Sequence, residues 1–259
     1  MPIQAFIFDV DGTIADTEEA HRVAFNLAFE HHGLGWRWQP TEYRELLKVA
    51  GGKERLHSYV DALPMGGSER ARLKAMVRDV HLDKTRFYSS VVRDGAVPLR
   101  AGVARLLEEA LSEGHRLAIA STTTAVNIEA LLQATLGPRG SGMFAVLACG
   151  DQVGRKKPAP DIYQLALREL ALPPESAVAF EDSPNGLRAA LAAGLATIVT
   201  PNFWTEDYEF PGAAAVLPHL GDPELPLPGE PGRQLASTAW LTCDEVSRIA
   251  ARHAAAAAH

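Results

Sequence analysis

The sequence predicts an α/β protein: a Rossmann-like parallel sheet with a helical domain inserted after the first strand. Short apolar runs bounded by turn or acidic residues recur along the chain, and helical patterns separate most of them. Runs of this kind are typical of strands buried on both faces, and a βα alternation is typical of parallel sheets. The first run breaks the rhythm, because the next convincing strand begins about a hundred residues later.

The individual elements follow from local patterns. The predicted strands cover residues 5–8, 117–120, 145–149, 177–180 and 196–199. The clearest helix runs from Val103 to Leu111, where apolar residues recur at i, i+3, i+4, i+7 and i+8 and Gly114 follows. Further helices are expected over residues 161–170 and 243–251. The Pro-rich and Gly-rich stretch after Pro201 predicts loops that wrap the core.

The inserted segment has little strand signal and looks helical throughout. Thr17 is a suitable N-cap, and Gly33 and the pair Gly51–Gly52 are suitable breaks. We therefore expect a core domain formed by residues 1–16 and 95–259 and a helical domain formed by residues 17–94. Linkers are expected near residues 15–17 and 94–99.

Composition excludes several classes of protein. Of the 259 residues 47% are hydrophobic, which rules out a disordered chain, and 25 Lys and Arg against 32 Asp and Glu give a net charge of −7. A nucleic-acid partner is not expected, because binding to a phosphate backbone needs a basic surface. Two distant cysteines fit a reducing compartment, and no apolar run approaches a membrane span. We expect a cytoplasmic monomer with no membrane partner.

Two aspartates follow the first strand, in the segment DVDGT at residues 9–13. Carboxylates this close repel each other unless a cation lies between them or one is protonated, so a hard divalent ion such as Mg²⁺ is expected. An Asp-rich turn without chemistry is the plain alternative. An EF-hand calcium loop is excluded, because Thr13, Ile14 and Ala20 occupy positions where that loop needs Asp or Asn, Gly and Glu.

Three weaker signals also lie near strand ends. They are STT at residues 121–123, KKP at residues 156–158 and EDS at residues 181–183. Helix capping explains the first and third equally well, and an exposed loop explains the second. All of them nevertheless lie at or just beyond the carboxyl ends of predicted strands, where open α/β sheets bind ligands. We therefore expect them to converge on one edge of the sheet.

Together these segments supply the groups needed for phosphoryl transfer. The carboxylate of Asp9 would attack phosphorus to give an aspartyl-phosphate, which divides one difficult displacement into two. Mg²⁺ and Lys157 would offset the repulsion between the carboxylate and the phosphate. Asp11 would protonate the departing sugar oxygen and then deprotonate the incoming water.

The segments DVDGT, ST, KKPAPDIY and EDS, in this order, resemble the four motifs of the haloacid dehalogenase superfamily over about residues 3–200. The helical insertion resembles the small α-helical cap of that superfamily. The resemblance implies these roles: nucleophile, Asp9; general acid and base, Asp11; phosphate ligands, Ser121 and Lys157, with Thr122 adding donors; Mg²⁺ ligands, the carboxylates of Asp9 and Asp182 and the backbone carbonyl of Asp11, with Glu181 supporting through water. The second aspartate favours a phosphatase or phosphomutase over a dehalogenase.

Within the superfamily, the cap sequence is similar to that of the CbbY phosphatases, which act in carbon fixation. Glu18 and His21 are three residues apart, so they share one helix face. The resemblance implies two sets of substrate-binding residues: Glu18, His21 and Tyr43 for the sugar; Gly52, Lys53, Arg55, Lys84 and Arg86 for the phosphate that is not cleaved. Solvated charges on helix surfaces are the alternative for these basic residues.

The leading prediction is a Mg²⁺-dependent sugar-phosphate phosphatase that forms an aspartyl-phosphate and removes the 1-phosphate of xylulose-1,5-bisphosphate. A sugar phosphomutase similar to β-phosphoglucomutase would use the same core, and a phosphatase for another small sugar phosphate also fits. A binding module without turnover is disfavoured, because it has no need for both Asp9 and Asp11.

Overall fold

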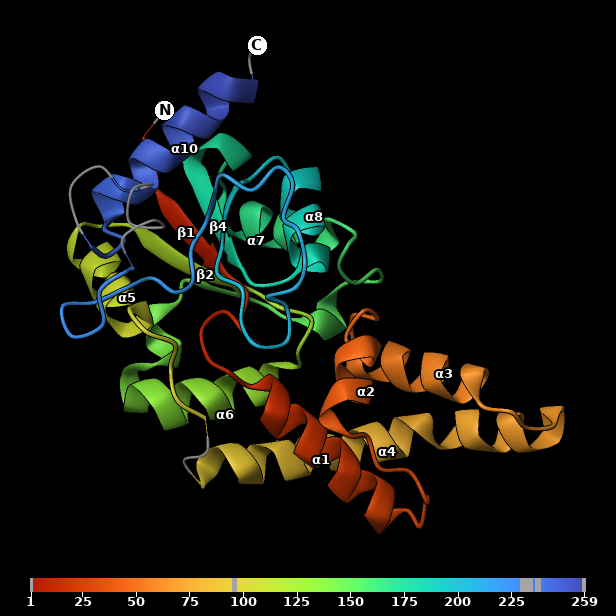
Figure 1. Ribbon diagram of the computed structural model, residues 1–259. Coiled ribbons are helices and arrows are strands. Elements are labelled where there is room, and N and C mark those ends of the chain that lie inside the picture. The colour runs from red at the N-terminus through yellow and green to blue at the C-terminus, as the bar shows by residue number, and fades with distance from the viewer. Residues whose placement is uncertain (1, 95–96, 229–234, 236–238, 258–259) are drawn as a thin grey trace.

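A parallel sheet of six strands lies at the centre of the computed structural model, which describes residues 2–94, 97–228, 235 and 239–257 (Figure 1). The strands are β1 (Ala5–Phe8), β2 (Arg116–Ala120), β3 (Val146–Ala148), β4 (Ala177–Glu181), β5 (Ala196–Val199) and β6 (Ala215–Val216). Their order in the sheet is β3-β2-β1-β4-β5-β6. The direction of strand addition reverses between β1 and β4, and ligands of open α/β sheets bind at such a switch point.

Helices cover both faces of the sheet. Those of the core are α5 (Val103–Ser112), α6 (Ala125–Leu136), α7 (Asp161–Leu170), α8 (Pro184–Ala192) and α10 (Cys243–Ala257). Phe6 and Phe8 of β1 are buried in the layer with α5, α6 and α10, whereas Ala5 and Ile7 are buried in the layer with α7 and α8. Because both faces are covered, the strands need apolar side chains at successive positions, which is the pattern that predicted them.

A helical cap lies beside the core (Figure 1). Its helices are α1 (Glu18–His31), α2 (Pro40–Leu46), α3 (Gly52–Ala62) and α4 (Gly67–Arg93). Aromatic residues form the centre of the cap, with the ring centroids of Phe25 and Trp38 4.8 Å apart and Tyr43 fully buried beside them. The predicted fold class, a parallel α/β core with an inserted helical cap, is confirmed.

The two chain crossings between core and cap lie together. Ala15 and Leu99 form an antiparallel bridge, and the backbone N–H of Arg100 donates to the carbonyl of Ile14 at 2.9 Å. The predicted linkers therefore run beside each other at this point. Residues 95–96 of the second linker lie outside the described residues, and the division of the chain at residues 16/17 and 94/95 stays a prediction.

Element boundaries differ from the prediction by small amounts. Strands β1 and β5 have the predicted bounds, β2 and β4 each gain one residue, and β3 loses one residue at each end. Strand β6 was not predicted, since two residues are too short for any periodicity. Gly52 begins α3 rather than interrupting a helix, and α10 continues to Ala257. Part of the predicted C-terminal wrapping segment, residues 229–234 and 236–238, lies outside the described residues.

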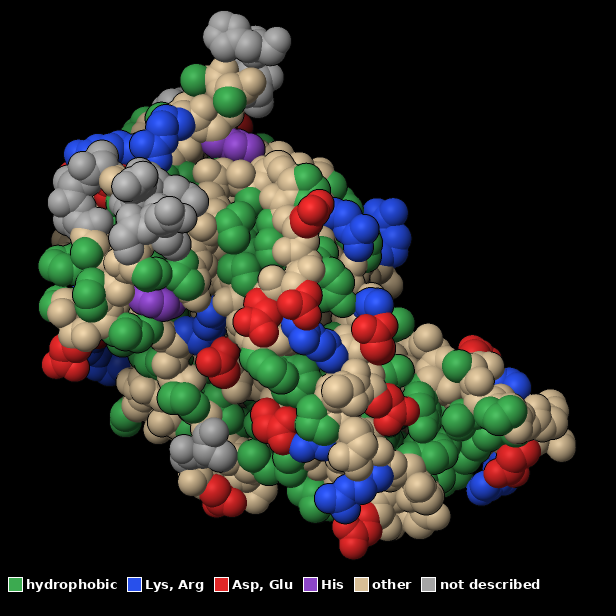
Figure 2. Space-filling view, in the orientation of Figure 1, with side chains coloured by type: hydrophobic (Ala, Val, Ile, Leu, Met, Phe, Trp, Pro, Cys, Tyr) green, Lys and Arg blue, Asp and Glu red, His purple; other side chains and the backbone are tan. Residues whose placement is uncertain are grey.

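The surface carries mixed charges. On the face shown in Figure 2, acidic and basic side chains are interspersed over core and cap. Within the described part of the chain, none of the helices combines the length and the apolar character needed to cross a membrane.

Removal of one aromatic ring from the sheet core tests how strongly the two central strands depend on each other. The ring of Phe180 stacks on Phe8 with centroids 4.4 Å apart, and both are buried. We expect Phe180→Ala to lower the free energy of unfolding by about 3–5 kcal/mol, because it loses apolar burial and leaves a cavity. Urea unfolding measures this, with the exposed Val126→Ala as control. A loss equal to that of the control would contradict the packing described.

Candidate active site

The turn after β1 brings carboxylates together at the switch point of the sheet. The backbone N–H of Asp9 donates to the carbonyl of Phe180 at 2.9 Å, so β1 and β4 are still joined there. Gly12 follows with a φ of +83°, and a Cβ at this position would lie 2.4 Å from Oδ2 of Asp182. Glycine is required here, because another residue would be strained and would collide with Asp182.

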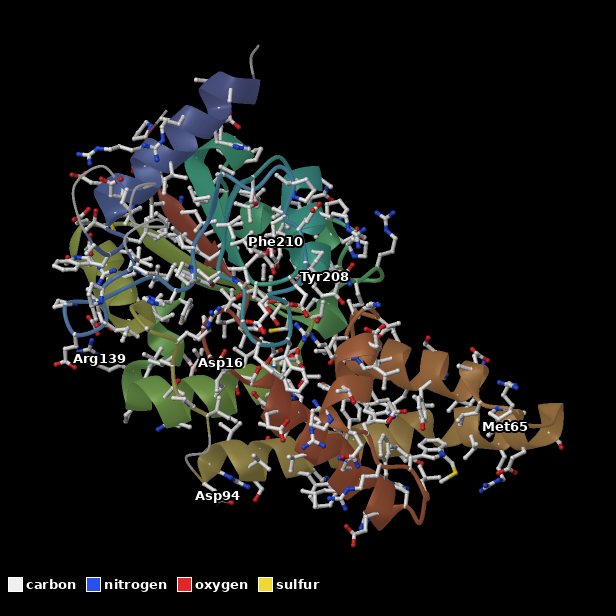
Figure 3. All side chains as sticks on the ribbon, in the orientation of Figure 1. Asp16, Met65, Asp94, Arg139, Tyr208 and Phe210 are labelled. Carbon is white, nitrogen blue, oxygen red and sulfur yellow. The ribbon has the colours of Figure 1, made fainter. Side chains whose placement is uncertain are left out.

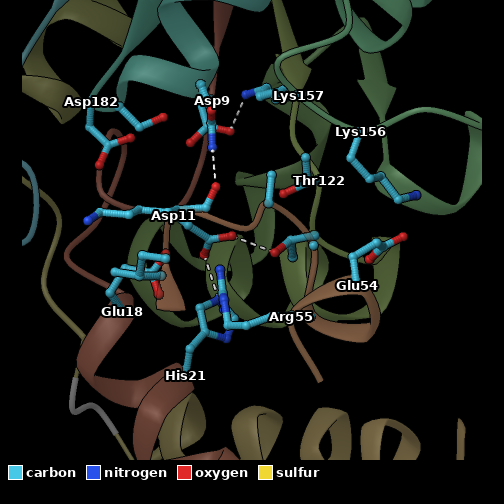
Figure 4. Close-up of a pocket in the computed structure, with 18 of the residues that line it drawn as sticks. Asp9, Asp11, Glu18, His21, Glu54, Arg55, Thr122, Lys156, Lys157 and Asp182 are labelled. Carbon is cyan, nitrogen blue, oxygen red and sulfur yellow. Dashed lines mark hydrogen bonds and ion pairs between the residues drawn. The ribbon is translucent and has the colours of Figure 1, made fainter. Parts of the chain in front are cut away.

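One ammonium group joins carboxylates from two strand ends. Nζ of Lys157 lies 2.7 Å from Oδ1 of Asp9 and 2.6 Å from Oε1 of Glu181. The hydroxyl of Tyr163, on α7, also donates to Oε1 of Glu181, at 2.6 Å. All four side chains are buried, and charge-assisted hydrogen bonds are strong where water is excluded. Figure 4 shows Lys157 against Asp9 at the core side of the pocket.

Burial dominates the protonation of this cluster. Burial raises the pKa of Asp9 to about 8, although the positive charge of Lys157 opposes the shift. Burial also raises the pKa of Asp182 well above its usual range, and the charge of Glu181 adds to the effect. Burial lowers the pKa of Lys157, but Asp9 and Glu181 outweigh it and the net direction is upward. One lysine therefore does not offset three carboxylates.

The same carboxylates fit a hard divalent cation. Asp9, Glu181 and Asp182 each offer a carboxylate oxygen, and these atoms lie within 4.8 Å of one another. Mg²⁺ prefers such oxygen donors and usually takes only one or two protein carboxylates. Glu181 already accepts from Lys157 and Tyr163, so it suits a supporting role, and Asp9 and Asp182 are the candidates for direct ligands. The predicted ligation by the backbone carbonyl of Asp11 stays a prediction.

The carboxylate of Asp11 is held from the cap side and from the core side. Oδ1 accepts from the hydroxyl of Thr17 at 2.6 Å and lies 2.8 Å from Nε2 of His21, while Oδ2 accepts from the hydroxyl of Thr123. Burial raises the pKa of Asp11, but the electrostatic attraction and hydrogen bond of His21, with the hydrogen bonds from Thr123 and Thr17, outweigh it and hold the pKa well below its usual range. Asp11 is therefore an ionised carboxylate here, in the form that accepts a proton.

His21 is itself fixed in place by two cap residues. Nζ of Lys84 lies 2.6 Å from Nδ1 of His21. An ammonium group only donates, so Nδ1 accepts, and Nε2 carries the proton that it donates to Asp11. The His21 ring also stacks on Tyr88 with centroids 4.1 Å apart. Burial lowers the pKa of Lys84 to about 8. The predicted residues His21 and Lys84 thus meet at the site.

The loop after β2 presents hydroxyl groups to the cavity. Thr122, Thr123 and Thr124 line it. Ser121 is buried, and its hydroxyl accepts a hydrogen bond from the backbone N–H of Thr123 at 3.2 Å. Ser121 does not line the cavity as described, so its contact with phosphate stays a prediction, whereas Thr122 lies where the prediction put it.

Tyr43 orients two residues of the cavity wall. Its hydroxyl donates to Oε2 of Glu18 at 2.9 Å and accepts from Nη1 of Arg55 at 3.1 Å. Glu18 and Arg55 line the cavity, but Tyr43 is fully buried and does not line it. The predicted direct contact between Tyr43 and the sugar is therefore corrected to a supporting role.

The cap residues predicted to bind the phosphate that is not cleaved separate into two groups. Gly52, Lys53 and Lys84 line the cavity. The side chain of Arg86 is 81% exposed and forms an ion pair with Asp83 at 3.0 Å. The prediction for Arg86 is wrong, because residues two apart on a helix point to different sides, and Lys84 takes the inward position on α4.

The cavity between core and cap has a volume of about 500 Å³. Figure 4 shows Asp9, Lys157 and Asp182 from the core on one side and Glu18, His21 and Arg55 from the cap on the other. Three further basic residues line it: Lys48, Lys156 and Arg188. The volume suits a small phosphorylated molecule, because ligand pockets of about 300–1,000 Å³ enclose compounds of that size.

The family model of haloacid dehalogenase-like hydrolases matches residues 3–194. The chain belongs to this family. Protein CbbY (plasmid) of Cupriavidus necator is 50% identical to it over 226 residues, which cover 87% of this chain and 89% of that protein. The phosphorylated carbohydrates phosphatase of Thermotoga maritima is 33% identical over 199 residues, which cover 76% of this chain and 84% of that protein.

A solved structure is also similar to this haloacid dehalogenase-like hydrolase. It is a mutant of CbbY from Rhodobacter sphaeroides in complex with xylulose-(1,5)bisphosphate, and it matches with a TM-score of 0.77 at 47% identity. The match covers 84% of this chain and 94% of that one. Together with the family match, these relatives identify the chain as an enzyme of the phosphatase type.

Several partners of the hydrolase site were not predicted from the sequence. Thr17 binds Asp11, Tyr163 binds Glu181, and Asn202 donates to Oδ2 of Asp182 at 2.7 Å. Asn202 follows β5, so the rule that ligand-binding residues follow strand ends would have found it. Thr17 carried a signal as well, but we interpreted it as a helix cap.

Binding of Mg²⁺ is expected to release protons from the hydrolase site. The pKa of Asp9 is raised to about 8, so this carboxyl is mostly protonated near pH 7, whereas a bound dication favours its ionised form. Titration calorimetry in buffers of different ionisation enthalpy should show about one or more protons released per Mg²⁺ near pH 7 and fewer near pH 9. Equal release at both pH values would contradict the raised pKa.

Proposed function

We propose that the protein is a Mg²⁺-dependent sugar-bisphosphate phosphatase that removes the 1-phosphate of xylulose-1,5-bisphosphate. One observation carries the proposal. A buried Asp9, held by Lys157, lies across a cavity from the cationic cap residues Lys53, Arg55 and Lys84. A ligand with a phosphate at each end would place one phosphate beside Asp9 and Lys157 and the other beside these cap cations. The similar CbbY structure in complex with xylulose-(1,5)bisphosphate supports this choice of substrate.

In the first step, the carboxylate of Asp9 attacks the phosphorus of the bound phosphate. Lys157 holds Oδ1 of Asp9, which leaves Oδ2 to form the new oxygen–phosphorus bond. The bond from phosphorus to the sugar oxygen breaks, and that oxygen takes a proton from Asp11. Asp11 carries no proton in the arrangement described, so the substrate would bring it: the phosphate binds as its monoanion and passes that proton to Asp11 before the bond breaks. The products are an aspartyl-phosphate and the free sugar hydroxyl.

In the second step, water attacks the aspartyl-phosphate. Asp11 takes one proton from the water, and its hydrogen bonds from Thr17 and Thr123 hold it in the ionised form that this requires. The acyl oxygen–phosphorus bond breaks, which releases inorganic phosphate and restores the carboxylate of Asp9. Lys157 stays beside Asp9 and offsets negative charge in both steps.

Asp9 and Asp182 would hold the Mg²⁺, with Glu181 behind them. A bound dication would offset the excess negative charge of the cluster and that of the phosphate. The carboxylate oxygens within 4.8 Å of one another support this assignment.

A panel of sugar monophosphates and bisphosphates tests the proposal. We expect release of inorganic phosphate to be fastest with xylulose-1,5-bisphosphate and to stop when EDTA removes Mg²⁺. Formation of an isomeric sugar phosphate without release of inorganic phosphate would instead identify a phosphomutase.

Substitution of the nucleophile is the second test. We expect Asp9→Asn to lower kcat by roughly 10⁴-fold, because an amide cannot form the acyl phosphate. Binding of the sugar phosphate, followed by calorimetry with the same variant, should persist. Normal turnover by Asp9→Asn would overturn the assignment of the nucleophile.

Two arginines of the cap, Arg55 and Arg86, give a third test, which compares a position in the cavity with one outside it. We expect Arg55→Ala to raise KM for the bisphosphate about tenfold or more, because it removes a charge-assisted contact and the support of Tyr43. Arg86→Ala should change KM less than about twofold, since its side chain is exposed. Steady-state kinetics checks both, and an equal effect would restore Arg86 to the binding site.

A further inference from the structure

We propose that residues 202–208, here called the docking loop, position the cap and the carboxylate of Asp182 together. Asn202 and Trp204 are the positioning residues. This inference rests on the proposed function. The docking loop follows β5, and in Figure 1 this segment descends from the sheet towards α1 and α2. Tyr208, labelled in Figure 3, lies on the side of the core that faces the cap.

One end of the docking loop holds a carboxylate of the acidic cluster. Nδ2 of Asn202 donates to Oδ2 of Asp182 at 2.7 Å and to the carbonyl of Gly12 at 3.2 Å. Oδ1 of Asn202 accepts from the backbone N–H of Trp204 at 2.8 Å. Every polar atom of this buried amide is therefore engaged, and its orientation is fixed.

Two residues further along the docking loop, Trp204 enters the cap. Trp204 is 7% exposed and packs edge to face on Tyr43, with ring centroids 5.7 Å apart. Among the described residues, it is the one member of the aromatic cap cluster that comes from the core. Arg44 of α2 donates to the carbonyl of Trp204 at 3.2 Å and forms an ion pair with Asp207 at 2.8 Å.

The contact with Tyr43 leads directly to the cavity. The hydroxyl of Tyr43 contacts Glu18 and Arg55, which line the cap wall. A path of packed and hydrogen-bonded groups thus joins Asp182 to that wall, and within it Asn202 and Trp204 are two residues apart. So short a segment transmits displacement between these two residues, because neither can move far alone.

The base of the docking loop is anchored to the core. The guanidinium of Arg100 donates to the carbonyl of Pro201 at 2.7 Å and to that of Gly12 at 2.6 Å. Burial lowers the pKa of Arg100. Arg100 therefore fixes the base of the loop that contacts both the cap and the carboxylate of Asp182.

Core and cap also meet elsewhere. Ala20, Ala24, Tyr88 and Val92 of the cap are buried in the apolar cluster of the core, and further contacts are polar. Asn185 donates to the carbonyl of Lys48 at 3.0 Å, and Lys53 forms an exposed ion pair with Asp151 at 3.2 Å. Exposed polar contacts exchange readily with water and contribute little. Trp204 is a core residue buried in the apolar cluster of the cap, beside Tyr43 of α2. That burial is lost when the cap separates, so Trp204 seats the cap at α2.

The test compares Trp204→Ala and Trp204→Phe with Trp36→Ala. Trp36 also packs in the aromatic cap cluster but contacts only cap rings there, Phe29 and Tyr59, so it controls for loss of cap stability. The probes are xylulose-1,5-bisphosphate, which needs the cap wall, and para-nitrophenyl phosphate, which needs the core groups, both at saturating Mg²⁺. Binding of Mg²⁺ alone is measured by calorimetry.

We expect Trp204→Ala to lower kcat/KM for the bisphosphate about tenfold or more and that for para-nitrophenyl phosphate less than about twofold. It should also weaken Mg²⁺ binding about threefold or more, because the loop that carries Asn202 loses its side-chain anchor in the cap. Trp204→Phe should recover most of both losses, and Trp36→Ala should change neither more than about twofold.

If the cap affects Mg²⁺ binding, Mg²⁺ must in turn affect the cap, and this effect can be measured without turnover. Mg²⁺ should slow amide hydrogen exchange in α2 of the unchanged protein and should not do so in Trp204→Ala or Asn202→Ala. The inference is overturned if Trp204→Ala matches Trp36→Ala in Mg²⁺ affinity and exchange, or if it lowers turnover of both phosphates equally. If the unchanged protein hydrolyses no sugar bisphosphate, the proposed function fails, and the binding and exchange measurements still decide the inference.

Discussion

Three buried carboxylates, of which two are paired with one ammonium group, impose the main constraint on this structure. Asp9, Glu181 and Asp182 meet because parallel β1 and β4 end side by side, and Lys157 offsets only part of their charge. A fold tolerates such repulsion where the site needs it for chemistry. Tyr163 and Asn202 supply hydrogen bonds that limit the cost. The surrounding loops are shaped by this need, as the close approach of Gly12 to Asp182 illustrates.

The two walls of the cavity divide the work. The core wall carries Asp9 and Asp182 beside Lys157, and it suits attack on phosphorus, whereas the cap wall carries cations around Glu18 and suits recognition. Asp11 stands between them, because its carboxylate is bound by Thr17 and His21 on one side and by Thr123 on the other. The residue proposed to transfer protons is thereby bound by the cap as well as by the core.

The sequence predicted most of the fold and the chemical centre of the site. Buried strands leave a strong apolar signal, and convergence at strand ends brought Asp9, Lys157 and Asp182 together correctly. The cap was harder, since the inward face of α4 is decided by packing, so Lys84 was placed correctly and Arg86 was not. Tyr163 escaped prediction, because a hydrogen bond between distant segments leaves no periodic trace in one sequence. Asn202 follows a strand end and was missed although that signal was present.

The pairing of Ala15 with Leu99 has a consequence for how this architecture diversifies. The chain leaves and re-enters the sheet domain at adjacent points. The whole helical insertion between them can therefore be replaced through two neighbouring positions. Recombination there would exchange the recognition surface, while Asp9, Lys157 and Asp182 stay in the core domain. Substrate repertoire and bond-breaking machinery are thus free to evolve at different rates within one polypeptide.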